Sequence, residues 1–113
     1  MSKYNNKIAY HGNIKFHSIK ERDYYRILLL LKKAANSKDR VVKIELQPRF
    51  PYKIEYHANG LTHYAKAFYD GDFKVWFADG RIDIIDVKGV KTATYKRKKK
   101  IIEKLYKIKI IEK

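Results

Sequence analysis

The dipeptide Asn59-Gly60 is the feature that most constrains how this chain can fold. Asn-Gly readily adopts the backbone angles of a tight antiparallel reversal and is the strongest short signal for a β-hairpin. Runs rich in β-branched and aromatic residues flank it, at 41–57 and at about 62–78, and the second run is broken near 70–71. The sequence therefore predicts two long antiparallel strands, with two prolines in the first strand marking an edge or a bend.

A third strand and a second helix follow this hairpin. The turn at 78–81 leads into a strand at 82–88, which completes an antiparallel meander. Thr92 can cap a helix at about 93–106, and 107–111 is a plausible final strand. Because a helix separates the last two strands, they are expected to lie parallel and to be joined by a right-handed crossover.

The N-terminal part predicts a small hairpin and then a helix. Strands at 7–10 and 14–16 precede a helix at about 19–36, for which Ser18 is a good N-cap and Glu21 completes a capping-box pattern. The whole chain, 1–113, is expected to be one domain, with an N-terminal hairpin or arm at 1–17 and a core at 18–113. The fold class is α/β, bordering on α+β: a mixed four-stranded sheet in αβββαβ order with a helix against each face.

The charge is unevenly distributed along the chain. The net charge is +15, and residues 1–42 hold ten Lys or Arg against three Asp or Glu. Residues 91–113 hold ten against two, whereas 43–90 hold seven of each. The two ends are therefore suited to a polyanion such as DNA. Five Asp fall within 70–86. Clustered carboxylates repel phosphate, but a nuclease needs them to hold the cation at the reacting phosphate.

The amino-acid composition excludes some kinds of site and indicates where the protein is located. The chain has no cysteine, so disulfides and thiolate zinc sites are excluded, which fits a reducing cytoplasm. No apolar run approaches the roughly 20 residues that a membrane-spanning helix needs, and the first residues lack a signal-peptide core. We expect a cytoplasmic protein with no membrane partner.

Three carboxylates and a lysine form the candidate site. Asp86 and Lys88 lie two apart in the strand at 82–88, so their side chains share one face, where they are paired, solvated or used in chemistry. Asp72 lies a similar distance from the turn on the preceding strand, and a helix on that face can add Glu21. Such oxygen donors suit Mg²⁺. The alternatives are a cap role for Glu21, a turn role for Asp72 and a structural Asp86–Lys88 ion pair.

These motifs resemble the PD-(D/E)xK nuclease superfamily, in particular small phage endonucleases of the Holliday junction resolvase and endonuclease I types. "DGDFKVW" carries the motif Asp at Asp72, with Gly71 in place of proline, and Asp70 is an alternative alignment. "IDIIDVKG" carries the (D/E)xK element, and the first helix carries the Glu. "ELQPRF" resembles a recurrent Gln-Pro stretch, and "KTATYKRKKK" resembles a basic helix. The resemblance covers nearly the whole chain and implies a restriction-endonuclease-like core.

The resemblance also implies an activity and its residues. Asp72, Asp86, the carbonyl group of Val87 and Glu21 would bind Mg²⁺, for which Mn²⁺ can substitute, and Lys88 would orient water or stabilise charge on phosphorus. The product would be a nick with 5′-phosphate and 3′-hydroxyl ends, and a homodimer is expected. The expected DNA contacts are Lys15, Lys20, Gln47, Lys91, Thr92, Lys96, Arg97, Lys99 and Lys100. Two alternatives stay open: a restriction-like or homing-like duplex endonuclease, and a basic nucleic-acid-binding module without catalysis.

Overall fold

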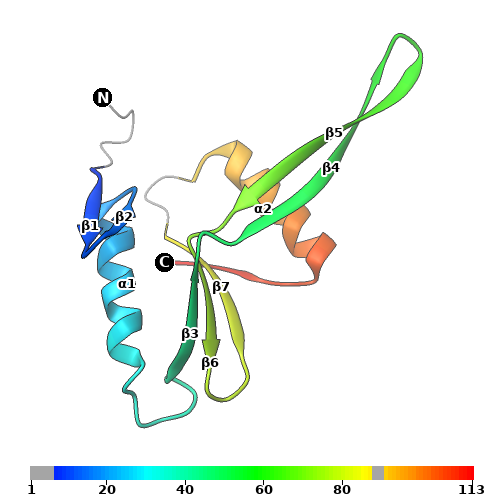
Figure 1. Cartoon of the computed structure of the whole chain (residues 1–113). Coiled ribbons are helices and arrows are strands. Elements are labelled where there is room, and N and C mark those ends of the chain that lie inside the picture. Colours follow the sequence, from blue (N-terminus) through cyan, green and yellow to red (C-terminus); the bar gives the residue numbers. More distant parts are fainter. Residues whose placement is uncertain (1–6, 88–90) are drawn as a thin grey trace.

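The computed structural model describes residues 7–87 and 91–113. These residues form two helices and eight strands (Figure 1). In chain order the elements are β1 (Ala9–His11), β2 (Ile14–Phe16), α1 (Ile19–Leu31), β3 (Val41–Leu46), β4 (Arg49–Ala58), β5 (Leu61–Asp70), β6 (Phe73–Phe77), β7 (Ile82–Asp86), α2 (Ala93–Tyr106) and β8 (Ile110–Glu112).

A mixed four-stranded sheet forms the centre of the molecule. Its strand order is β3-β6-β7-β8, in which β8 runs parallel to β7 and the other neighbours are antiparallel. The helix α2 connects the two parallel strands. The mixed α/β class and the αβββαβ order of the sheet and its helices are therefore confirmed. Neither helix in the described part of the chain is long and apolar enough to cross a bilayer.

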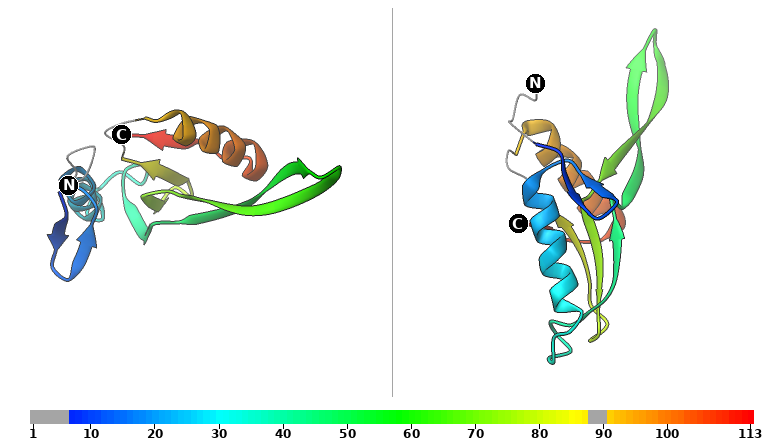
Figure 2. Two further views of the ribbon diagram at one scale, coloured as in Figure 1. Left: turned by 90° about the horizontal axis from the view of Figure 1, so that it is seen from above. Right: turned by 60° about the vertical axis from the view of Figure 1, so that its left-hand side comes forward.

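The predicted long hairpin is present, but it is divided between two sheets. From Lys43 onward its register does not change, because Leu46 lies opposite Phe73 and Arg49 lies opposite Asp70; the register shifts only between Val41 and Lys43. Between these pairs the chain bends, and β4 and β5 leave the core as a separate two-stranded sheet, here called the ribbon (Figures 1 and 2). The sequence predicted an edge or a bend at the two prolines and a break near 70–71, and the bend beside Pro48 and the pairing of the two runs are confirmed. The first run is divided into two strands, β3 and β4.

The bend depends on two positions. Gln47 has a φ of +50°, a left-handed conformation that side chains other than glycine seldom adopt. Opposite it, a Cβ atom at Gly71 would lie 3.3 Å from the ring of the buried Pro48, so glycine lets the two strands approach closely. Backbone hydrogen bonds of 2.9 Å, from Gln47 N to Asp72 O and from Gly71 N to Pro48 O, continue the pairing through the bend.

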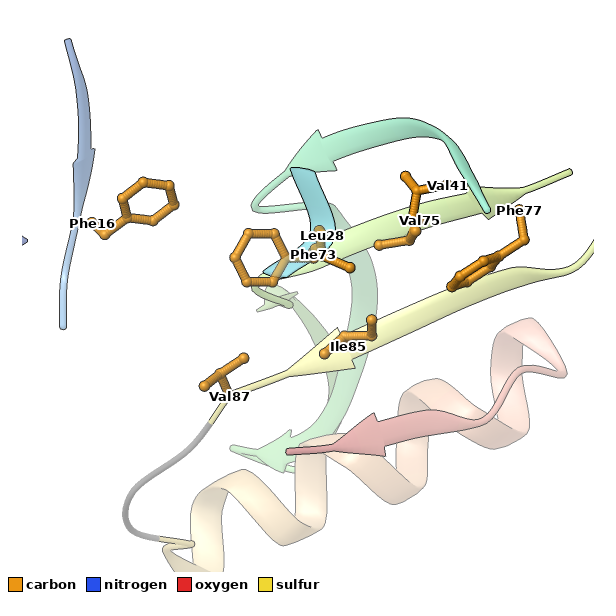
Figure 3. Close-up of a cluster of buried hydrophobic side chains, with 8 residues drawn as sticks. All are labelled: Phe16, Leu28, Val41, Phe73, Val75, Phe77, Ile85 and Val87. Carbon is orange, nitrogen blue, oxygen red and sulfur yellow. The ribbon is translucent and has the colours of Figure 1, made fainter. Parts of the chain in front are cut away.

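The two faces of the sheet bury different side chains. The first cluster lies between the sheet and α1 (Figure 3), and it consists of Phe16, Leu28, Val41, Phe73, Val75, Phe77, Ile85 and Val87. The second cluster lies beneath α2, and it consists of Tyr52, Tyr69, Ile84, Tyr95, Ile102 and Ile110. Ile84 and Ile85 are neighbours on β7 yet belong to different clusters, since side chains alternate along a strand. Each helix therefore covers one face, as predicted.

The helix α1 is shorter than predicted. It ends at Leu31 rather than near 36, and Lys32 is its C-cap. The Arg40 guanidinium reaches back to the carbonyl oxygens of Ala34 and Ala35, at 3.3 and 3.1 Å, and so satisfies backbone acceptors that a continuing helix would have used. Ile27, on this helix, is half exposed.

The C-terminal strand is displaced from its predicted position at 107–111. Lys107 has a φ of +56° and ends α2 in a left-handed cap. The chain then turns before β8 begins at Ile110. The final strand consequently occupies Ile110–Glu112, and its parallel pairing with β7 agrees with the prediction.

Candidate active site

Asp72 lies where the ribbon joins the sheet. It is buried, and its backbone N donates to the carbonyl oxygen of Ile85 on the neighbouring strand at 3.0 Å. Its carboxylate Oδ2 accepts a hydrogen bond of 2.6 Å from the backbone N of Val87. These two bonds hold the carboxylate beside the end of β7, next to Asp86 and Val87. Asp70 instead is exposed and forms a two-pronged ion pair with Arg49, so the structure places Asp72 rather than Asp70 next to Asp86.

Asp86 is the last residue of β7 and has no exposed surface. Its Oδ2 accepts a hydrogen bond from the Tyr69 hydroxyl group. Burial, followed by the hydrogen bond to Asp86, raises the pKa of Tyr69 above its ordinary value, so this phenol stays protonated and continues to donate. Tyr69 lies near the base of the ribbon, and the position of Asp86 therefore depends on how the ribbon joins the sheet.

Glu21 is held in the first turn of α1. Its backbone N donates to the Ser18 side chain at 3.1 Å, which confirms Ser18 as the N-cap. The Glu21 carboxylate accepts from the backbone N of His17 at 2.9 Å, one residue before the N-cap position that a capping box uses. Glu21 is only 8% exposed. The cap role predicted as an alternative and a place in the site are thus compatible.

Glu21 and Asp72 line the same pocket. Its volume is about 140 Å³, and its lining residues are Lys15, Phe16, Glu21, Leu46, Gln47, Asp72 and Phe73. The left-handed conformation of Gln47 at the bend brings its amide to this pocket, within 3.4 Å of the His17 ring. Two carboxylates from distant parts of the sequence therefore line one pocket, together with one lysine and one amide.

The three predicted carboxylates do not gather around one point. Within 7–87 and 91–113, no group of three or more His, Asp or Glu side chains is placed to hold one metal ion. Asp86 is bonded to Tyr69, and Lys88 lies outside the described residues. The residues at the pocket nevertheless fit Mg²⁺, because this ion needs only one or two protein carboxylates when substrate phosphate and water supply its other oxygens.

Glu112 on β8 is a third carboxylate at this end of the sheet, and the sequence analysis missed it. It lies opposite Asp86 in the parallel pairing. It accepts from the Tyr95 hydroxyl group at 3.1 Å and forms ion pairs with Lys99 at 3.1 Å and Lys91 at 3.6 Å. The hydrogen bond from Lys99 is the main cause of its lowered pKa. The predicted parallel final strand could have pointed to Glu112, since parallel neighbours end at the same edge.

The predicted DNA contacts differ in their surroundings. Lys91, Thr92 and Lys99 have structural partners: the two lysines pair with Glu112, and the Thr92 side chain caps α2 by accepting from Tyr95 N at 3.1 Å. Gln47 lies at the pocket. The remaining side chains are exposed and basic, and they are Lys15, Lys20, Lys96, Arg97 and Lys100.

Comparison with known proteins gives a family but no activity. The model of a family described as "Protein of unknown function (DUF1064)" matches residues 1–111, and the chain belongs to that family. No curated protein matches the chain, and no solved structure does either.

Proposed function

We propose that this member of the DUF1064 family is a Mg²⁺-dependent, structure-selective DNA endonuclease, of the kind that resolves Holliday junctions. The observation that carries the proposal is the pocket shared by Glu21 and Asp72, with Asp86 at the end of the adjacent strand, in a chain of net charge +15. The αβββαβ order is consistent with a restriction-endonuclease-like core. Carboxylates in a strongly basic chain are expected where a cation must neutralise phosphate.

The proposed mechanism assigns a role to each group. Glu21 and Asp72 would hold Mg²⁺ or Mn²⁺ at the pocket, and Asp86 with the carbonyl group of Val87 would complete the set. The bound cation would polarise the scissile phosphate and lower the pKa of an attacking water molecule. Lys88 would orient that water or stabilise charge on phosphorus. The products would be 5′-phosphate and 3′-hydroxyl ends.

Binding and assembly follow from the charge and from the substrate. The exposed basic residues at both ends of the chain would bind DNA phosphates without reading bases. Symmetric cleavage of a four-way junction needs two active sites, so the enzyme would act as a homodimer, in the cytoplasm.

A second candidate is a basic nucleic-acid-binding module without catalysis. The observation that favours it is that the described carboxylates do not form a three-ligand metal group. A third candidate is a nuclease acting on linear duplex, which would use the same carboxylates.

One assay separates these candidates. A labelled four-way junction and a matched linear duplex are incubated with the protein in Mg²⁺, Mn²⁺, Ca²⁺ or EDTA. We expect junction cleavage in Mg²⁺ or Mn²⁺, binding without cleavage in Ca²⁺, and no cleavage in EDTA. Equal cleavage of the duplex would support the duplex endonuclease. Binding without cleavage under every condition would leave the binding module, and strong cleavage in EDTA would refute the role of the carboxylates.

A further inference from the structure

The two faces of the ribbon differ sharply in chemistry. Residues directly opposite in an antiparallel pair share a face. Beyond the core, one face consists of Ile54 opposite Ala65, Tyr56 opposite His63, and Ala58 opposite Leu61. We call these six residues the apolar face. The other face, here called the polar face, carries Lys53 opposite Lys66, Glu55 opposite Tyr64, and His57 opposite Thr62.

The apolar face continues the side of the ribbon that is buried near the sheet, but its own large side chains are exposed. Nearer the sheet, the same side of the ribbon buries Tyr52 and Tyr69 in the cluster beneath α2. There the ring of Phe50 meets Tyr106 edge-on at 5.2 Å, and the Tyr106 hydroxyl group donates to Pro51 O at 2.6 Å. Farther out, large side chains are open to solvent: Ile54 is 45%, Tyr56 47% and Leu61 64% exposed.

Such a surface is unfavourable for a ribbon that stands alone. An isolated two-stranded hairpin is marginal in water, and it gains stability when its apolar side packs against another element. The ribbon extends away from the core in both views of Figure 2. The alternation from Phe50 to Ala58 is that of a half-buried sheet, which indicates that a partner covers the apolar face.

The charge of the chain selects the kind of partner. The apolar face contains no Lys, Arg, Asp or Glu, whereas binding to DNA phosphates requires Lys or Arg. Two copies of a chain with a net charge of +15 repel each other over most of their surfaces, but not where charges are missing. An apolar face is also complementary to itself, as a two-fold symmetric interface requires.

We propose that the apolar face of the ribbon packs against the same face of a second copy of this chain, giving a two-layered, four-stranded contact between two subunits. This interface rests on the ribbon alone and does not require nuclease activity. It also provides the second active site that symmetric junction cleavage needs. Tyr69 links the base of the ribbon to Asp86, so the interface and the candidate site are parts of one structure.

The test compares two tyrosines on opposite faces of the ribbon. Tyr56 lies on the apolar face, and Tyr64 lies on the polar face and is 66% exposed. The molar mass of the whole chain, of Tyr56→Lys and of Tyr64→Lys is measured by sedimentation at protein concentrations up to about 100 μM. Since a Tyr56→Lys dimer would bury two lysines, we expect its dissociation constant to rise about a hundredfold or more. Tyr64→Lys should dimerise as the unchanged chain does.

A second substitution guards against loss of folding. Leu61→Lys changes the most exposed of these apolar side chains. The monomer does not depend on the position of this side chain, so the Leu61→Lys protein should fold. The substitution should also weaken the dimer. A monomeric unchanged chain, a dimer that survives Tyr56→Lys and Leu61→Lys, or equal dissociation by Tyr64→Lys would each overturn the proposal. A monomer in which only the apolar-face substitutions reduce DNA binding would assign the face to DNA and would equally refute it. None of these outcomes depends on a cleavage assay. The proposed interface and the proposed nuclease activity can therefore be refuted independently of each other.

Discussion

The long hairpin has two halves that keep one register from Lys43 onward but have opposite surroundings. In the half that consists of β3 and β6, Phe73 and Val75 are buried beneath α1. In the ribbon, the equally apolar Ile54 and Leu61 are largely exposed. The alternating pattern specifies in both halves which side chains share a face. Whether that face is buried depends on the elements that pack against it: Phe73 and Val75 belong to the cluster beneath α1, whereas Ile54 and Leu61 lie outside both clusters.

The candidate site lies at the boundary between these halves. Asp72 directly follows the bend, and Tyr69, which donates to Asp86, directly precedes it. The left-handed Gln47 brings a third group to the same place. The bend therefore does more than aim the ribbon, because it also assembles polar groups that a straight hairpin would have distributed over two faces of a sheet.

The largest expected effect is at this boundary. Asp86→Asn should abolish Mg²⁺-dependent cleavage while the fold stays intact, since an amide oxygen can still accept from Tyr69 and a buried negative charge is removed. Junction binding in Ca²⁺ should be kept or strengthened. The measurements are cleavage, binding and thermal melting.

Asp70→Asn is the matched control, because Asp70 is exposed on the ribbon side of the bend and pairs with Arg49. It should keep nearly full cleavage. Near-normal cleavage by a folded Asp86→Asn protein would overturn the site assignment and leave DNA binding as the surviving function.

The next effect contrasts the charged ends of the chain with the ribbon. If the ends neutralise about six to ten phosphates, affinity for DNA should fall by about 10³–10⁵-fold between 50 and 200 mM salt. Replacing Lys96, Arg97 and Lys100 by glutamine should lower the slope of log K against log salt by about 1 for each residue. Replacing Lys53 and Lys66 on the ribbon should change it little. A flat salt response would show that the charged ends are not the binding surface.

The two halves of the hairpin should also differ in how much a substitution lowers the free energy of unfolding. Phe73→Ala removes a ring that is 1% exposed, and it should lower the free energy of unfolding by about 3–5 kcal/mol. Tyr64→Ala, on the polar face of the ribbon, should stay within about 0.5 kcal/mol of the unchanged chain. Denaturant titration followed by circular dichroism measures both. Similar losses in the two variants would mean that the ribbon belongs to the same cooperative core as the sheet.

Lys88→Ala tests whether the lysine that follows Val87 takes part in cleavage. If Lys88 stabilises charge in the transition state, cleavage should fall by roughly 10²-fold with little change in binding or melting. A large loss of stability, with unchanged cleavage by the folded fraction, would instead support the structural Asp86–Lys88 ion pair.

The sequence predicted these elements unequally, for physical reasons. The bounds of α2 follow from Thr92 at its start and from the apolar spacing within it. The reversal at Asn59-Gly60 is equally local. By contrast, the prolines indicate an edge or a bend, but glutamine has no marked preference for a left-handed backbone, so the sequence does not show that Gln47 adopts it. The early end of α1 depends on a contact from Arg40, which only the folded chain provides.

The sequence likewise predicted only part of the candidate site. Counting from the turn at 78–81 correctly placed Asp72 and Asp86 at one end of the sheet, because antiparallel register is regular. The bond from His17 to Glu21 and the bond from Tyr69 to Asp86 connect elements whose relative positions depend on tertiary packing. For that reason, the orientation of each carboxylate was not available from spacing alone.

The smallest expected effect concerns Glu112, which lies beside Asp86 on the sheet side of the boundary. Its pKa is lowered by the hydrogen bond from Lys99, and the unfolded chain restores the ordinary value near 4.3. A carboxyl group with a lowered folded-state pKa stabilises the fold above its unfolded pKa, and this contribution is lost as the pH falls through the folded value. Because the side chain is 26% exposed, Glu112→Gln should cost only about 1 kcal/mol at pH 7. The melting difference between the variant and the unchanged chain should shrink as the pH drops below about 4. Glu55→Gln, the same change on the exposed ribbon, should have no measurable effect at pH 7. A difference for Glu112→Gln that persists unchanged at low pH would show that shape and packing, rather than its charge, stabilise this end of the sheet.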